Sequence, residues 1–117
     1  DRLCEAFTPL DNVYMAAAPA FTKAQLREEL LTLLPEDALN RPVCTLSGGQ
    51  KRRTAIYRAL CAPFDLLIMD EPFTGLDEDT RLEVIQYIKK KSAGKLTLLS
   101  THQQSDINAL GGILIHL

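Results

Sequence analysis

The first segment that could do chemistry is residues 46–50, with the sequence Leu-Ser-Gly-Gly-Gln, which we expect to open a helix. The first N–H groups of a helix have no partner inside it, and the helix start carries a partial positive charge of about +0.5. Because Gly48 and Gly49 have no side chains, a phosphate could touch this backbone directly. Ser47 and Gln50 also have the spacing of a capping box, so an ordinary glycine-rich helix start is the alternative interpretation.

The second segment is the pair Asp70 and Glu71, at the end of the apolar run 65–70. Such a run is typical of a strand buried on both faces, and Pro72 is expected to hold Glu71 extended and to end the strand. Ligands of parallel α/β sheets bind at the carboxyl ends of strands. One carboxylate could organise Mg²⁺ there, and its neighbour could polarise an attacking water. A polar strand exit is the alternative, which the glycine-rich helix start makes the weaker one.

His102 follows a second apolar run, 95–100, and is expected at the same edge of the sheet as Asp70. It could donate a hydrogen bond to a phosphoryl oxygen or orient a water, although a structural role is the common alternative. The cations of residues 51–53 oppose the dipole of their helix, which indicates a nearby anion or acidic partner unless they form a solvated face. Because the chain contains no G-x-x-x-x-G-K-[S/T] loop, we expect it to supply only part of a nucleotide site.

Helices are expected before these segments. Thr8 and Pro9 predict a short helix to about residue 17, and Thr22 predicts a second helix that Pro35 stops. The buried face of the second helix would consist of Leu26, Leu30, Leu33 and Leu34. Residues 36–45 are expected to form a loop with room for one helical turn.

From Ser47 onward, helices and strands alternate, which predicts a parallel sheet with right-handed crossovers. The helix that begins at Ser47 would bury Ile56, Ala59 and Leu60. Asp77 is expected to cap a helix over residues 78–91, whose inward side chains would be Leu82, Ile85 and Ile88. A short helix over 104–109 and a third strand over 113–117 complete the α/β pattern.

Charge and cysteine content exclude several classes of function. The net charge of −2 and the pI of about 5.6 argue against general nucleic-acid binding, which requires a basic surface. Cys4, Cys44 and Cys61 match neither a zinc site nor a disulfide framework, which favours a reducing cytosol. No apolar run is long enough to cross a bilayer, and the start on Asp1 hints that an upstream part has been removed.

Taken together, the motifs resemble those of ABC-type ATPases. In the order and spacing of that family, residues 46–50 are similar to the signature motif, 70–72 to Walker B, 75–77 to the D-loop and 100–102 to the H-loop. Residues 9–13 are similar to the segment that follows the Q-loop. The resemblance implies a partial P-loop NTPase fold, with a helical subdomain segment over 1–45 and part of a RecA-like α/β core over 46–117.

The resemblance also implies roles for individual residues. The γ-phosphate of ATP bound to a partner subunit would be contacted by the signature residues Ser47, Gly48, Gly49 and Gln50. Asp70 would order Mg²⁺, Glu71 would be the catalytic base and His102 would contact the γ-phosphate. Communication across the dimer would involve Asp77, and further residues frequent in the family are matched by Arg53 and the tripeptide at 58–60.

In this family Walker A, the adenine-stacking loop, the Q-loop glutamine and the first core strand belong upstream of Asp1. We therefore predict that the 117 residues alone neither bind ATP tightly nor hydrolyse it, and that unpaired apolar sheet edges cause self-association.

The leading interpretation is the ATP-hydrolysing subunit of an ABC transporter of importer type. It implies ATP and Mg²⁺ as ligands, and a second ATPase subunit and a membrane-spanning subunit as partners. The expected location is the cytoplasm, at the inner face of the cell membrane. A soluble ABC-type ATPase without a transport role is one alternative, and a truncated, non-catalytic scaffold is the other.

Overall fold

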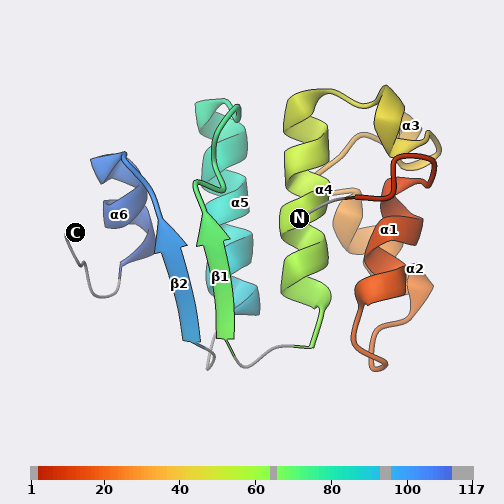
Figure 1. The fold of residues 1–117 in the computed structure, drawn as a ribbon, viewed down its shortest axis with the longest axis horizontal. Helices are drawn as coiled ribbons and strands as arrows, with labels where there is room; N and C mark the ends of the chain where they lie inside the picture. Colours follow the sequence, from red (N-terminus) through yellow and green to blue (C-terminus); the bar gives the residue numbers. More distant parts are fainter. Residues whose placement is uncertain (1–2, 64–65, 93–95, 112–117) are drawn as a thin grey trace.

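The structure is a computed structural model of the chain, and it describes residues 3–63, 66–92 and 96–111. Figure 1 shows a helical half beside a half that contains two parallel strands. The elements in chain order are α1 (Pro9–Ala16), α2 (Lys23–Leu30), α3 (Glu36–Leu39), the 3-10 helix η1 (Val43–Thr45), α4 (Gly48–Cys61), β1 (Leu66–Asp70), α5 (Glu78–Lys91), β2 (Leu96–Ser100) and α6 (Gln104–Leu110). No helix among these residues has the length and hydropathy needed to cross a bilayer.

Four helix starts lie where the sequence predicts them. Thr8, Thr22 and Ser47 cap α1, α2 and α4, and in each case the hydroxyl oxygen accepts a hydrogen bond from the N–H three residues later. Asp77 caps α5 in the same way, accepting from the Thr80 N–H at 2.8 Å. These predictions are confirmed because capping depends on residues only three positions apart.

The second helix ends earlier than predicted. It stops at Leu30 rather than at Pro35, and the Thr32 hydroxyl then donates to the Glu29 carbonyl oxygen at 2.6 Å. Leu33 and Leu34 still reach the core, because their N–H groups donate to the Leu30 carbonyl oxygen in tight turns. The following region contains two short helical segments, α3 and η1, where one turn was expected.

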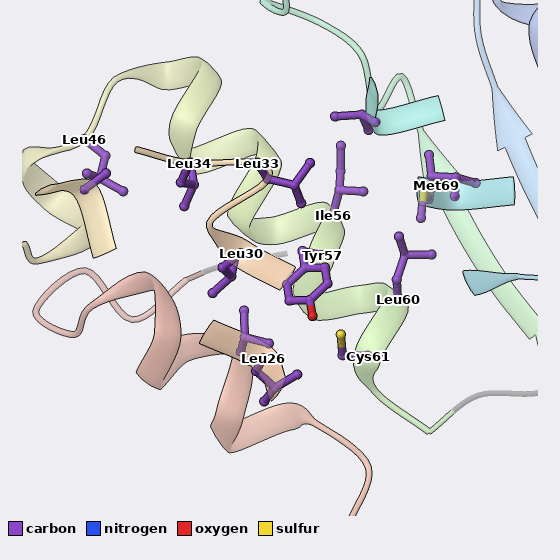
Figure 2. Packing of buried hydrophobic residues seen from close by; sticks show 14 of the residues in the cluster. Leu26, Leu30, Leu33, Leu34, Leu46, Ile56, Tyr57, Leu60, Cys61 and Met69 are labelled. Carbon is purple, nitrogen blue, oxygen red and sulfur yellow. The ribbon is translucent and has the colours of Figure 1, made fainter. Parts of the chain in front are cut away.

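The helical half has a closed core. Helix α1 packs against α2 and α4, and Val13, Leu26, Leu30 and Tyr57 are completely buried between them. Figure 2 shows Tyr57 of α4 facing Leu26 and Leu30 of α2 at the centre of this cluster. The amphipathic faces of these helices therefore find their apolar partners within the chain.

Strands β1 and β2 pair in parallel, from Leu66 beside Leu96 to Asp70 beside Ser100. Helix α5 lies behind β1 in Figure 1, and the side chains of Leu67 and Met69 are buried on that side. On the opposite face Ile68 is 66% exposed and Leu96 is 61% exposed. The prediction that residues 65–70 form a strand buried on both faces is therefore wrong, because no described helix covers the second face.

The inward face of α5 also differs from the prediction. Ile85 and Ile88 are buried as expected, but Leu82 is 43% exposed, and Arg81 takes an inward position instead. In α4, Ile56 and Leu60 are buried and Ala59 is half-buried against the core. The strand expected over 113–117 lies outside the described residues.

Candidate functional site

The three candidate residues at the sheet edge lie together in the structure. Asp70 is the last residue of β1, and its carboxylate accepts a hydrogen bond from the hydroxyl of Ser100, its register partner on β2. Glu71 follows Asp70, and its Oε1 lies 3.0 Å from Nε2 of His102. The His102 side chain is 92% exposed, so its imidazole remains open to a ligand above the strand ends.

The backbone at Glu71 departs from the prediction. Pro72 was expected to keep Glu71 extended, but Glu71 has φ of 46°, in the left-handed region. Bonds from distant residues hold it there: its N–H donates to the Ser100 carbonyl oxygen at 3.1 Å, and its own carbonyl oxygen accepts from Arg52 Nη1 at 3.4 Å. Thr74 Oγ1 donates to the same carbonyl at 3.2 Å. Such a conformation costs on the order of 1–3 kcal/mol and is typical of functional sites.

The oxygen atoms beside β1 suit a magnesium ion. Asp70 offers a carboxylate, and Ser100 offers a hydroxyl beside it. Within the residues that the structure describes, no group of three or more His, Cys, Asp or Glu side chains could form an all-protein metal cage. Mg²⁺ commonly binds proteins through one or two carboxylates and takes its remaining oxygens from water and phosphate, which this sparse donor set would permit.

At the start of α4, the capping box is complete. Ser47 Oγ accepts from the Gln50 N–H at 3.1 Å, and Gln50 Oε1 accepts from the Ser47 N–H at the same distance. The exposed Ser47 hydroxyl thereby keeps its proton for another acceptor. A Cβ added at Gly48 would meet no atom within 4 Å, so packing among the described residues does not require glycine there. Open backbone at this point is what contact with an external anion would need.

The cations in the first turn of α4 have partners inside the chain. Lys51 Nζ lies 3.5 Å from a carboxylate oxygen of Glu5, and Arg53 Nη1 donates to Thr80 Oγ1 at 3.3 Å. Arg52 reaches the Glu71 carbonyl oxygen, as described above. The sequence predicted a nearby anion or acidic partner for residues 51–53, and for Lys51 this partner is Glu5. No local sequence pattern indicated this contact.

Asp77 is exposed at the start of α5. Its carboxyl pKa is lowered, first by the hydrogen bonds that it accepts from the N–H and hydroxyl of Thr80 and then by the charge of Arg53. The neighbouring Gly75 carbonyl oxygen would lie 3.6 Å from a Cβ at Gly49, so the loop before α5 borders the start of α4. The structure thus brings residues 46–50 and 75–77 side by side.

Two hollows are lined by the candidate residues at the sheet edge and by the start of α4. A cleft of about 740 Å³ runs between α4 and the exposed face of β1, and Gly48, Arg52 and Asp70 all line it. A second hollow of about 460 Å³ is bordered by Glu71, by the start of α5 and by the loop after β2. Asp70 and Glu71, adjacent in sequence, therefore face different hollows.

The sequence model of the ABC transporter family matches residues 2–74, which include residues 46–50, Asp70 and Glu71. The chain belongs to the ABC transporter family. The resemblance to this family that the motifs indicated is thereby confirmed.

Relatives of this ABC transporter chain include import and export proteins. It is 39% identical over 90 residues to the molybdenum import ATP-binding protein ModC of Rhodobacter capsulatus, covering 74% of this chain and 25% of ModC. It is 37% identical over 116 residues to the Nod factor export ATP-binding protein I of Cupriavidus metallidurans, covering 94% of this chain and 38% of that protein. The chain therefore spans less than half the length of either relative.

Solved ABC structures share the fold. The bacterial ABC transporter cassette MJ0796, solved as a dimer, superposes with a TM-score of 0.72 and 28% identity, covering 92% of this chain and 51% of that one. A second structure of MJ0796 is a post-hydrolysis dimer bound to ADP and Pi. The predicted partial P-loop NTPase fold is thus confirmed.

Sequence reasoning missed one polar group near this site. Arg81 of α5 and Asp106 of α6 form a buried ion pair, and Asp106 also contacts Thr101, the residue before His102. Charged residues usually lie in solvent, so sequence reasoning did not single out either of them. The only available signal was that Arg81 interrupts the apolar side of α5 at an inward position.

Proposed function

We propose that this chain provides the hydrolytic end of the ATPase subunit of an ABC transporter. Asp70 would order Mg²⁺, Glu71 would act as the general base, and His102 would hold the γ-phosphate of ATP. The 3.0 Å contact between Glu71 and His102, beside Asp70 at the ends of two paired parallel strands, carries this proposal. Mg²⁺, when bound, would neutralise charge that develops on the phosphate oxygens.

The proposed chemistry requires a base and a phosphate contact on the same side of the sheet. The Glu71 carboxylate would accept a proton from the attacking water. At the same time the water oxygen would bond to the γ-phosphorus, and the bond from that phosphorus to the leaving ADP would break. As an imidazolium, the exposed His102 ring would donate from one nitrogen to a γ-phosphate oxygen and from the other to the Glu71 carboxylate. The bonds at the Glu71 backbone would fix the direction from which its carboxylate approaches.

The start of α4 would act on ATP bound to a second ATPase subunit. Contacts to its γ-phosphate would come from the backbone and side chains of Ser47, Gly48, Gly49 and Gln50. The open space at Gly48 and the unused hydroxyl proton of Ser47 support this assignment. Asp77, at the start of α5 and close to the start of α4, would relay the state of one ATPase subunit to the other. The dimeric form of MJ0796 supports the pairing of two such subunits.

The remaining parts of the proposal concern partners and location. Residues 1–45 would belong to a helical subdomain that docks on a membrane-spanning subunit, and 46–117 to the ATPase core. The protein would then lie in the cytoplasm at the inner face of the membrane. Similarity to ModC supports transport of importer type, whereas similarity to a Nod factor export protein makes export the competing direction.

The decisive experiment is steady-state ATP turnover by a cassette in which this chain follows an N-terminal segment that contains Walker A, called here the Walker A half. We expect Glu71→Gln to lower kcat by about a thousandfold, within the range for loss of a general base. Glu83→Gln, which neutralises an exposed carboxylate on the outer side of α5, is the matched control and should retain wild-type kcat. Equal activity of wild type and Glu71→Gln would contradict the assignment of Glu71 as the base, and a wild-type cassette without ATP turnover would favour the scaffold interpretation.

A second measurement addresses the 117 residues alone. We expect calorimetric titration with Mg-ATP to show no tight binding, because nothing in this chain matches the loop that cradles the α- and β-phosphates. Binding at micromolar concentration would show that the described residues form a nucleotide site by themselves.

A further inference from the structure

A buried polar group lies directly beneath the loop that carries His102. The Asp106 residue is 1% exposed and Arg81 is 8% exposed, although both carry charge. Arg81 Nη1 donates to Asp106 Oδ1 and also to Ser105 Oγ, the latter at 3.1 Å. The second carboxylate oxygen, Oδ2, accepts from the Thr101 hydroxyl at 2.8 Å. Both oxygens of a carboxylate that water does not reach are thus used.

Stability alone is a weak reason for such a pair. Burying two charges removes them from water, and replacing a buried ion pair with apolar residues is often neutral or stabilising. The group lies between α5, α6 and the loop after β2, at the border of the hollow of about 460 Å³. Its location therefore points to something that the pair holds in place.

What it holds is the backbone on both sides of His102. Thr101 Oγ1 donates to Asp106 and accepts from the Gln103 N–H at 3.2 Å. The residues before and after His102 are therefore tied to one hydroxyl, while the imidazole itself is 92% exposed. An exposed side chain has little packing to orient it, so the orientation of His102 comes from its backbone and from its contact with Glu71.

At its other end, the group is joined to the start of α5. The Arg81 N–H donates to the Asp77 carbonyl oxygen at 2.8 Å, and Arg81 Nη2 lies 3.7 Å from a Glu78 carboxylate oxygen. The hollow of about 460 Å³ is bordered by Glu71, Arg81, Thr101 and Asp106. A continuous set of bonded residues thus runs from the Asp77 cap to the loop that places His102 beside Glu71.

We propose that Arg81, Asp106 and Thr101 are positioning residues that fix His102 against Glu71, an inference that rests on the hydrolytic function proposed above. None of the three touches the reacting atoms. Their action is to fix the backbone at 101–103, and through Arg81 they make that loop responsive to the position of the start of α5.

The test compares Thr101→Val with Thr101→Ser in the cassette that carries this chain after a Walker A half. Valine matches threonine in shape but lacks the hydroxyl, whereas serine keeps it, and neither leaves a buried charge without a partner. We expect Thr101→Val to lower kcat by about tenfold or more while KM for ATP changes by less than about twofold, since misplacing a contact to the reacting phosphate affects the chemical step. Thr101→Ser should retain kcat.

A second readout does not depend on ATP turnover. In the 117-residue chain, Thr101→Val removes the acceptor of the Gln103 N–H, so hydrogen exchange at that amide should become about tenfold faster, and Thr101→Ser should leave it unchanged. Asp106→Asn, which keeps an acceptor but loses the charge facing Arg81, should also accelerate this exchange. Amides in α4 provide an internal reference for global unfolding.

The outcomes separate the two proposals. If the wild-type cassette does not hydrolyse ATP, the proposed function is wrong, and exchange at Gln103 alone decides whether the loop is tied as described. If the cassette is active but Thr101→Val keeps wild-type kcat, the positioning role is overturned. It is also overturned if Thr101→Val and Thr101→Ser lower kcat to the same extent. A parallel rise in KM with unchanged kcat would also overturn it, because that result would indicate a binding role.

Discussion

The helical half and the strand half of the described chain differ in how completely they bury apolar side chains. Around α1, α2 and α4, Val13, Leu26, Leu30 and Tyr57 have no exposed surface. On the open face of β1 and β2, the leucines and isoleucine remain about half exposed or more, and they alternate with buried residues in β1 and with half-buried residues in β2. The helical half is therefore stabilised by contacts within the chain, whereas the described residues leave one face of the strand half largely uncovered.

The largest expected effect is on the helical core. Leu30→Ala removes a side chain enclosed by α1, α2 and α4, and we expect it to lower the free energy of unfolding by about 3 kcal/mol. Leu98→Ala, on the open face of β2 where the side chain is 49% exposed, should cost less than about 1 kcal/mol. Urea denaturation of both variants, followed by circular dichroism, measures the difference. Equal losses would mean that the two halves do not differ in packing.

The next effect concerns association through the open face. Ile68 and Leu98 lie on the same side of the sheet because they are register partners on parallel strands. A second copy could cover this surface, and we expect Ile68→Lys with Leu98→Lys to weaken self-association by about a hundredfold, or about 2.8 kcal/mol. Sedimentation at several concentrations gives the constant. Leu31→Lys, at an exposed leucine of the helical half, is the control, and a wild-type chain that stays monomeric would contradict the prediction.

Sequence predicted the features that depend on near neighbours and failed on those that depend on distant ones. The four helix caps follow from residues three positions apart, and all four are present. The early end of α2 did not follow, because Thr32 and Tyr87, far apart in sequence, share a hydrogen bond of 2.6 Å there. Burial of β1 on both faces did not follow either, because an apolar run does not indicate how many faces are covered.

The same distinction holds in the candidate site. Apolar runs before Asp70 and His102 placed both residues at one edge of a parallel sheet, and the structure has them there. The left-handed backbone of Glu71 could not be predicted, because bonds from Ser100 and Arg52 hold it against the preference that Pro72 imposes. The buried pair beneath His102 was missed because sequence does not show which charges are enclosed.

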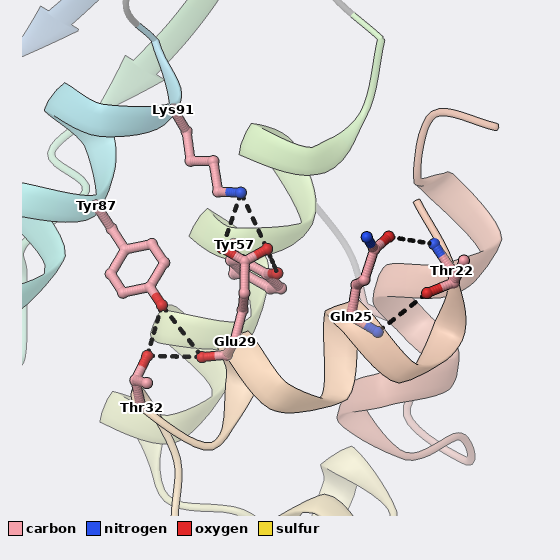
Figure 3. Close-up of polar contacts among 7 residues, drawn as sticks. All are labelled: Thr22, Gln25, Glu29, Thr32, Tyr57, Tyr87 and Lys91. Atoms are coloured by element: carbon pink, nitrogen blue, oxygen red, sulfur yellow. Dashed lines mark hydrogen bonds and ion pairs between the residues drawn. The ribbon is translucent and has the colours of Figure 1, made fainter. Parts of the chain in front are cut away.

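A polar junction joins the two halves, as Figure 3 shows. Glu29 of α2 accepts a hydrogen bond from the Tyr57 hydroxyl at 2.8 Å, and its other carboxylate oxygen lies 2.8 Å from Lys91 Nζ at the end of α5. Tyr87 of α5 adds a bond to Thr32 and stands edge-on to Tyr57, with 6.0 Å between ring centroids. The helical half is therefore attached to α5, which covers one face of the strands.

Breaking this junction should have an intermediate effect. Glu29→Gln keeps an acceptor for Tyr57 but leaves the partly buried Lys91 without its opposite charge, and we expect a loss of about 1–2 kcal/mol in the free energy of unfolding. Lys91→Met should cost a similar amount. The double variant should recover part of the loss, because neither charge is then left alone. Strictly additive losses would show that Glu29 and Lys91 do not stabilise each other.

The smallest predicted effect is a loss of stability at alkaline pH, which originates in the core of the helical half. Burial, followed by hydrogen bonds with Cys61 and Glu29, raises the pKa of Tyr57 above its ordinary 10.0, so the folded chain keeps this hydroxyl protonated while the unfolded chain ionises. Stability is then fully present below pH 10 and falls as the pH rises above it, by about 1 kcal/mol near pH 11.

Burial also raises the pKa of the Cys61 thiol, which acts in the same direction from about pH 9, its ordinary pKa being 9.0. Urea titrations between pH 8 and 11 in a Cys61→Ala background isolate the tyrosine contribution. Tyr57→Phe should flatten the decline there, whereas Tyr14→Phe, at a tyrosine that is 49% exposed, serves as the matched control. If Tyr57→Phe left the decline unchanged, the alkaline loss would have to arise outside the closed core, and the contrast between the two halves would not extend to their ionisable groups.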